Sequence, residues 1–186
     1  LYFVANLASQ HVKVALSGEG ADEIFGGYNI YAEPYTVSWY YKIPYFIRRT
    51  LGIIAYPLRG YRGFNFIVRR GKKLEDRYVG NAFIYDNDEI NKVLSYKRGK
   101  MTYKDITKPY YDKVKNKDEV SKMQYIDFNF WLIGDILLKA DKMSMANSVE
   151  LRVPFLDKEV WKLSQKIPTK YMVRDGQTKY IFRKIA

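Results

Sequence analysis

The 186-residue sequence contains no cysteine and only one histidine, His11. Without cysteine it can form no disulfide framework and no thiolate zinc site, which agrees with a cytoplasmic protein. Ser17 has no histidine base near it in the sequence, so a Ser-His-Asp hydrolase triad is unsupported. Aspartate, glutamate and histidine form no cluster at metal-ligand spacing, and the sequence therefore predicts no metal site built by the protein itself.

Long apolar runs are also absent, although 47% of the residues are hydrophobic. No window approaches the roughly twenty consecutive apolar residues that a membrane-spanning helix needs. The chain is long enough to bury a core as one domain or part of one. Because it starts at Leu1 and soon reaches a strand-like run, we expect an excised piece of a longer protein.

Residues 34–74 lack acidic side chains altogether and interleave basic with aromatic residues. This segment supplies most of the net charge of +12. Such a surface can bind nucleic acid or an anionic membrane, so a non-catalytic binding module is one hypothesis. The favoured alternative is a helical insert with inward aromatic side chains, whose charges stay solvated or meet an acidic neighbouring domain, because charge runs are most often solvated faces.

A glycine-rich and acidic run follows the strand-like residues 12–16, which alternate between the two faces of a strand. Gly18 and Gly20 permit a tight turn that brings backbone N–H groups close to a ligand. The helix expected over residues 22–32 carries Asp22 and Glu23 in its first turn, where negative charge is favoured. A strand that ends in such a loop is the usual place for a ligand in α/β sheets.

Residues 17–28 resemble the Ser-Gly-Glu-Gly-Ala/Ser-Asp-Glu-x-Phe-Gly-Gly-Tyr signature of glutamine-dependent asparagine synthetases, in the C-terminal domain that uses ATP. Residues 139–157 resemble the family's Lys-x-Asp-Arg/Lys-x-Ser-Met-Ala-x-Ser-x-Glu-x-Arg-x-Pro-Phe-Leu-Asp segment. Residues 179–183 are similar to its Lys-x-x-Leu-Arg element, with Phe182 at the leucine position. The resemblance implies that residues 1–186 are the C-terminal portion of this synthetase domain, with residues 34–120 a divergent basic and aromatic helical insert.

The resemblance implies a carbon–nitrogen ligase that adenylates the aspartate side chain and transfers glutamine-derived ammonia, giving asparagine, AMP and pyrophosphate. Its substrates are then aspartate, ATP and ammonia, its Mg²⁺ is bound with ATP, and its partner is an upstream glutaminase domain. That domain and the family's Ser-Gly-Gly-x-Asp-Ser loop for ATP pyrophosphate are absent here, so we expect this chain alone to be inactive. A related ligase that adenylates another carboxylate, as β-lactam synthetases do, stays open, as does a homo-oligomer.

Residue roles follow from the same resemblance. Glu19 is expected to orient or deprotonate ammonia, with capping of the next helix as its alternative role. Lys179 is expected to face the leaving pyrophosphate, with an exposed surface lysine as the alternative. Contacts to substrate or nucleotide are expected from Ser17, Gly18, Gly20 and Asp22.

Four other motif charges are expected to shape the pocket without touching the substrate: Asp141, Glu150, Arg152 and Asp157. Arg152, placed between Glu150 and Asp157, is a candidate for a buried ion-paired strut.

The fold expected is a mainly α fragment with one short strand, part of an α/β adenine-nucleotide alpha-hydrolase-like (ATP pyrophosphatase) domain. Residues 1–10 read as the end of a helix. A second helix begins at the N-cap Asp118 and buries an apolar stripe formed by Met123, Ile126, Phe130, Ile133 and Leu137. A third begins at Asp157 and ends before Pro168, burying Val160, Leu163 and Ile167. Residues 174–176 read as a turn, and Thr178 as the start of the last helix.

Overall fold

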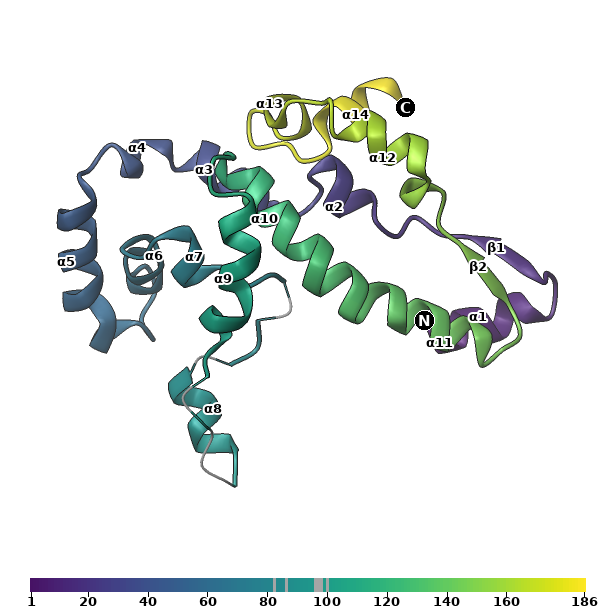
Figure 1. The fold of residues 1–186 in the computed structure, drawn as a ribbon, viewed down its shortest axis with the longest axis horizontal. Coiled ribbons are helices and arrows are strands. Elements are labelled where there is room, and N and C mark those ends of the chain that lie inside the picture. Colours follow the sequence, from purple (N-terminus) through teal and green to yellow (C-terminus); the bar gives the residue numbers. More distant parts are fainter. Residues whose placement is uncertain (82, 86, 96–98, 100) are drawn as a thin grey trace.

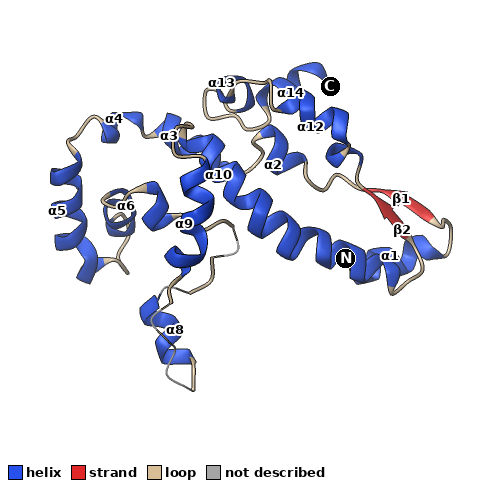
Figure 2. Ribbon diagram, viewed as in Figure 1, coloured by secondary structure: helices blue, strands red, loops and turns tan. Residues whose placement is uncertain are grey.

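In a computed structural model the chain is mainly helical and carries one small parallel sheet (Figures 1 and 2). The structure describes residues 1–81, 83–85, 87–95, 99 and 101–186. Strand β1 (Val14–Leu16) pairs with β2 (Glu150–Arg152), with Leu16 opposite Arg152. The prediction of a single strand was therefore wrong. The alternation of polar and apolar residues over 150–152 is the signal that could have predicted β2.

The other elements are helices and short helical turns. The N-terminal part holds α1 (Tyr2–Ser9), α2 (Ala21–Phe25), the 3-10 turn η1 (Asn29–Ala32), α3 (Glu33–Thr36) and α4 (Ser38–Tyr41). The central part holds α5 (Tyr45–Ala55), η2 (Tyr56–Leu58), α6 (Phe64–Arg70), α7 (Leu74–Arg77), α8 (Asn87–Val93) and α9 (Tyr103–Lys113). The C-terminal part holds α10 (Glu119–Asp127), η3 (Phe128–Leu137), α11 (Leu138–Met145), η4 (Pro154–Leu156), α12 (Lys158–Ser164), α13 (Thr169–Met172) and α14 (Tyr180–Ile185).

Helices α10, η3 and α11 form one continuous rod through the molecule (Figure 1). Asp118 caps it, as predicted, by accepting a hydrogen bond from the Ser121 N–H at 3.0 Å. The middle third, η3, is a π-helix, whose wider turn moves the buried face relative to an α-helix. As a result Leu132 is fully buried, whereas Ile133, predicted to be buried, is 54% exposed.

Three other helix predictions needed correction. The helix expected over residues 22–32 is broken, because Gly26 takes a left-handed conformation (φ 69°) directly after α2 and the chain continues in η1. Helix α12, predicted to begin at Asp157, begins at Lys158 with Asp157 as its N-cap, but Leu163 is 60% exposed and Ser164 is the fully buried residue. The last helix begins at Tyr180 rather than at Thr178.

The predicted turn at residues 174–176 is confirmed. Arg174 and Gln177 exchange both backbone hydrogen bonds across it, and Asp175 and Gly176 both have positive φ.

The basic segment, residues 34–74, folds mainly into helices α5 and α6, which pack closely at one point. A Cβ on Gly52 would lie 3.2 Å from the Cα of Gly71, so glycine permits this backbone approach. Aromatic side chains do not all pack inward, because Tyr40 is buried whereas Trp39 and Phe46 are largely exposed.

A carboxylate lies at the centre of the core. Asp127, on α10, is fully buried, and its Oδ2 accepts hydrogen bonds from the hydroxyls of Tyr31 (2.5 Å) and Tyr78. The backbone N–H of Asn81 donates to Oδ1 at 2.8 Å, and the Asn81 side-chain amide donates to Oδ2. Around this group pack apolar residues from several elements, among them Met123 and Ile126. A buried carboxylate with this many donors is satisfied without a counter-charge.

We expect Tyr31→Phe to destabilise the protein by about 1.5–3 kcal/mol, since it removes a hydrogen bond to a buried charged group. Tyr35→Phe is the matched control, because the exposed Tyr35 hydroxyl donates only to Thr169 Oγ1 at 3.2 Å. Thermal denaturation of both variants measures the difference. Equal melting temperatures would contradict the central role of Asp127.

Stability should also depend on the titration of Asp127. Burial raises the pKa of Asp127 above its usual range, so the native state binds this proton more tightly than the unfolded chain does. The free energy of unfolding should therefore fall as pH rises from about 4 through the raised pKa, by up to about 1.4 kcal/mol per pH unit. The buried Glu23 contributes in the same direction, but its contribution cancels in a comparison with Asp127→Asn. Parallel pH profiles for wild type and Asp127→Asn would refute this assignment.

Candidate functional site

The two parallel strands end at the same edge of the sheet, and each is followed by one of the motif segments. The N–H of Ser17, directly after β1, donates to the carbonyl oxygen of Arg152, the last residue of β2, at 2.9 Å. This bond extends the ladder by one residue, so the two loops leave the sheet side by side. The carboxyl edge of a parallel sheet is where α/β proteins usually hold ligands.

The two glycines of the loop have different surroundings. Gly20 has φ 86°, and a Cβ there would collide with the Leu156 side chain of η4, so both conformation and space require glycine. A Cβ on Gly18 would meet no atom within 4 Å, which leaves the backbone at this position open to a ligand.

Glu19 lies between them, half-buried, with its N–H 3.4 Å from Ser17 Oγ. The N-cap of α2 is Gly20, with no side-chain cap, so the alternative role of Glu19 as a helix cap is wrong.

Lys179 and Asp22 are brought together from distant parts of the sequence. The Lys179 Nζ lies 2.9 Å from Asp22 Oδ1, and the two side chains are 22% and 39% exposed. Lys179 is the N-cap of α14 and has φ 51°, a left-handed conformation that costs a lysine roughly 1–2 kcal/mol. Its N–H donates to the carbonyl oxygen of Gly26 at 3.2 Å. A Cβ on Gly27 would collide with the Asp22 carboxylate, so glycine at this position leaves room for the ion pair.

An aromatic cluster joins the three motif segments behind this ion pair. Phe25 stacks on Phe182 with ring centroids 5.3 Å apart, and Phe155 packs edge-on against both rings at 6.1 and 5.5 Å. Phe182 stands where the resembled signature has leucine, and here its ring completes the cluster. Phenylalanine in place of leucine at position 182 therefore still provides an apolar contact between α2 and α14.

Glu23 anchors α2 rather than facing solvent. Its side chain is buried and accepts a hydrogen bond from the Tyr28 hydroxyl at 2.7 Å, while Trp131 Nε1 donates to the same hydroxyl at 2.9 Å. Burial raises the pKa of Glu23. Gln124 Nε2 donates to the Glu23 carbonyl oxygen at 2.7 Å, which ties α2 to the central rod. Trp131 and Gln124 were missed by the sequence analysis, because both lie far along the chain in a segment that matched no motif.

The buried strut expected around Arg152 is not formed. Arg152 Nε does pair with Glu150 Oε1 at 2.9 Å, but the two side chains are 63% and 58% exposed. Residues two apart on a strand share one face, and this face of β2 is open to solvent. Asp157 instead caps α12 by accepting from the Glu159 N–H at 2.8 Å, and Asp141 lies exposed on α11.

In the part of the chain that the structure describes, no group of three or more histidine, aspartate or glutamate side chains is placed to hold a metal ion. Among the same residues, no helix has the length and apolar character needed to cross a membrane.

Comparison with known proteins adds the family context. The asparagine synthase family model matches residues 1–186, the basic segment included. The chain is 48% identical over 187 residues to "Asparagine synthetase [glutamine-hydrolyzing] 1" of Bacillus subtilis, covering 100% of this chain and 30% of that protein. It is 46% identical over 185 residues to a "Putative asparagine synthetase [glutamine-hydrolyzing]" of Mycobacterium bovis, covering 99% of this chain and 28% of the relative. The chain therefore spans less than a third of the length of these curated relatives. No solved structure matches it.

We expect Gly27→Ala to separate Lys179 from Asp22 while the fold is kept, because the new methyl group collides with the ends of these two side chains. Mass spectrometry after brief lysine acetylation should show faster labelling of Lys179. Gly60→Ala is the control, since a Cβ there meets no atom within 4 Å. Unchanged labelling of Lys179 in Gly27→Ala would contradict the geometry described here.

Proposed function

This chain belongs to the asparagine synthase family, and on that premise we propose that it forms the C-terminal part of the site at which an ATP-dependent ligase converts aspartate to asparagine. The observation that carries the proposal is the meeting of the three motif segments around α2, where Phe25, Phe155 and Phe182 pack together and Lys179 pairs with Asp22. These segments are up to about 160 residues apart in sequence, and only folding brings them together.

We propose that the two strands belong to a larger parallel sheet of the adenine-nucleotide alpha-hydrolase type. Parallel sheets are normally covered on both faces. Here Val14 and Leu16 of β1 are 41% and 75% exposed, as are several apolar residues of α1. Further structure packed on this side would explain the exposed apolar surface.

The chemistry requires positive charge where pyrophosphate leaves. In the proposed reaction an aspartate side-chain oxygen attacks the α-phosphorus of ATP, the bond to the β-phosphate oxygen breaks, and pyrophosphate departs. The Lys179 ammonium, oriented by Asp22, is placed to stabilise the charge that develops on the leaving oxygen. Its left-handed backbone supports a functional role, because strained conformations of this kind concentrate at active sites.

The second step requires a polar group beside the incoming ammonia. Ammonia attacks the carbonyl carbon of β-aspartyl-AMP, AMP leaves, and a proton is released. We assign that proton to Glu19, which lies on the loop between the two glycines. The open backbone around Ser17 and Gly18 is assigned to AMP, and Asp22 to the neighbourhood of the aspartate substrate.

The described residues do not form a metal site of their own, and the Asp22 carboxylate is already paired with Lys179. We therefore assign Mg²⁺ to the phosphates of ATP, where phosphate oxygens and several retained waters would supply its ligands. Ammonia is proposed to come from glutamine through a glutaminase domain in the same protein, in line with the names of the relatives. A cytoplasmic location fits these substrates.

The test is aspartate-dependent formation of AMP and pyrophosphate by the full-length protein with ATP, Mg²⁺ and ammonium. We expect Lys179→Gln to lower kcat by about 10²–10³-fold, the usual loss when one preorganised electrostatic donor is removed. Lys184→Gln is the matched control on the same helix, since Lys184 is exposed and contacts only the Tyr180 ring. Glu19→Gln should slow asparagine formation more than AMP formation. Wild-type turnover in both active-site variants would overturn the assignment.

A further inference from the structure

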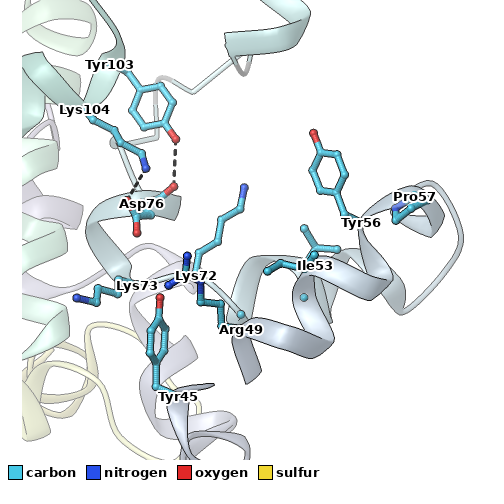
Figure 3. A pocket seen from close by; sticks show the side chains of 13 residues that line it. Tyr45, Arg49, Ile53, Tyr56, Pro57, Lys72, Lys73, Asp76, Tyr103 and Lys104 are labelled. Carbon is cyan, nitrogen blue, oxygen red and sulfur yellow. Dashed lines mark hydrogen bonds and ion pairs between the residues drawn. The ribbon is translucent and has the colours of Figure 1, made fainter. Parts of the chain in front are cut away.

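A pocket with no role in the proposed reaction lies among helices α5, α6, α7 and α9, at the opposite end of the molecule from the sheet (Figures 1 and 3). Its volume is about 570 Å³, within the range of small-molecule sites. None of its lining residues belongs to the three motif segments. The cations that line it are Arg49, Lys72, Lys73 and Lys104, which come from α5, the turn between α6 and α7, and α9 (Figure 3).

The pocket carries uncompensated positive charge. Its one lining carboxylate, Asp76, is paired with Lys104 at 2.5 Å. In the part of the chain that the structure describes, no carboxylate pairs with Arg49, Lys72 or Lys73. Three like charges on the wall of one cavity repel each other, and an anion with several charges would relieve that repulsion.

The rest of the lining is aromatic or aliphatic. Gly52 of α5 and Gly71 after α6 lie close together beside the pocket, since a Cβ on Gly71 would lie 3.0 Å from the Cα of Gly52. Ile53 and Val68 line the pocket from α5 and α6. Aliphatic side chains suit a planar ring, which needs contact on its face rather than hydrogen bonds.

We propose that this pocket binds a nucleoside polyphosphate, with the phosphates at Arg49, Lys72 and Lys73 and the base against Ile53 and Val68. The volume of the pocket, about 570 Å³, favours a small ligand over a duplex nucleic acid, which would need a basic stripe along the surface. The site is separate from the one proposed for ATP consumption, so its occupation neither requires nor prevents the ligase reaction. It would give a second nucleotide a place to bind on the synthetase.

GTP is the probe, because ATP is also assigned to the other site. Isothermal titration of the full-length protein with GTP, in the absence of ATP, should show binding that weakens as salt is raised. The double variant Arg49→Gln/Lys72→Gln should bind GTP at least about tenfold more weakly, since both cations are exposed and contribute directly to phosphate binding. Inorganic triphosphate, which has no base, should bind wild type at least about tenfold more weakly than GTP.

Lys42→Gln/Arg62→Gln is the matched control. It removes the same charge from the same basic segment, but neither residue lines the pocket, so GTP binding should be unchanged. Asparagine formation should stay at the wild-type level in both double variants, which separates this proposal from the proposed function. Absence of GTP binding, equal losses in the two double variants, equal binding of inorganic triphosphate, or tighter binding of duplex DNA than of GTP would each overturn it.

Discussion

The buried carboxylate of Asp127 is the contact on which the arrangement of the chain depends. It lies on the central rod and accepts hydrogen bonds from Tyr31 in η1 and from Tyr78 and Asn81 after α7, so it joins three parts of the sequence. Breaking it would leave a charge uncompensated in the core, which costs far more than the loss of one exposed contact. The same rod reaches the candidate site, because Trp131 and Gln124 bind the Tyr28 hydroxyl and the backbone of α2. The position of the loop at residues 17–20 is therefore fixed from the core outward.

Sequence reasoning succeeded where the cause of a structure is local. The N-cap Asp118 and the turn at 174–176 depend on a few adjacent residues, and both are confirmed. It failed where the cause is distant. Strand β2 exists because β1 pairs with it, the break after α2 requires the left-handed Gly26, and the exposure of Ile133 follows from the π-helical turn of η3. At the site, the motif residues could be named from the sequence, but the Asp22–Lys179 pair could not, since no spacing encodes a contact over 157 residues.

Some cations in the central part of the chain pair with a carboxylate and others do not. One acidic residue forms several of these pairs. Glu33 stands just before the stretch that lacks carboxylates, and it binds Arg70 and Arg77 at 2.6 and 2.7 Å and Arg69 at 3.6 Å. Arg70 and Arg77 thereby have a carboxylate partner inside the fold. Of the cations that line the pocket beside α5, Arg49, Lys72 and Lys73 have no such partner among the described residues. Composition alone does not distinguish arginines that pair with a carboxylate in the fold from cations that are available to a ligand.

The left-handed backbone conformation of Lys179 is independent support for a functional role of this residue. Glycine would hold a left-handed N-cap without strain, and asparagine would hold it at little cost. A lysine bears the strain only where its side chain contributes more than the backbone loses, and the contribution that the structure shows is the ion pair with Asp22. What the lysine adds is an ammonium group held at a fixed point by Asp22. Such a charge in that place is useful chiefly to an anionic ligand.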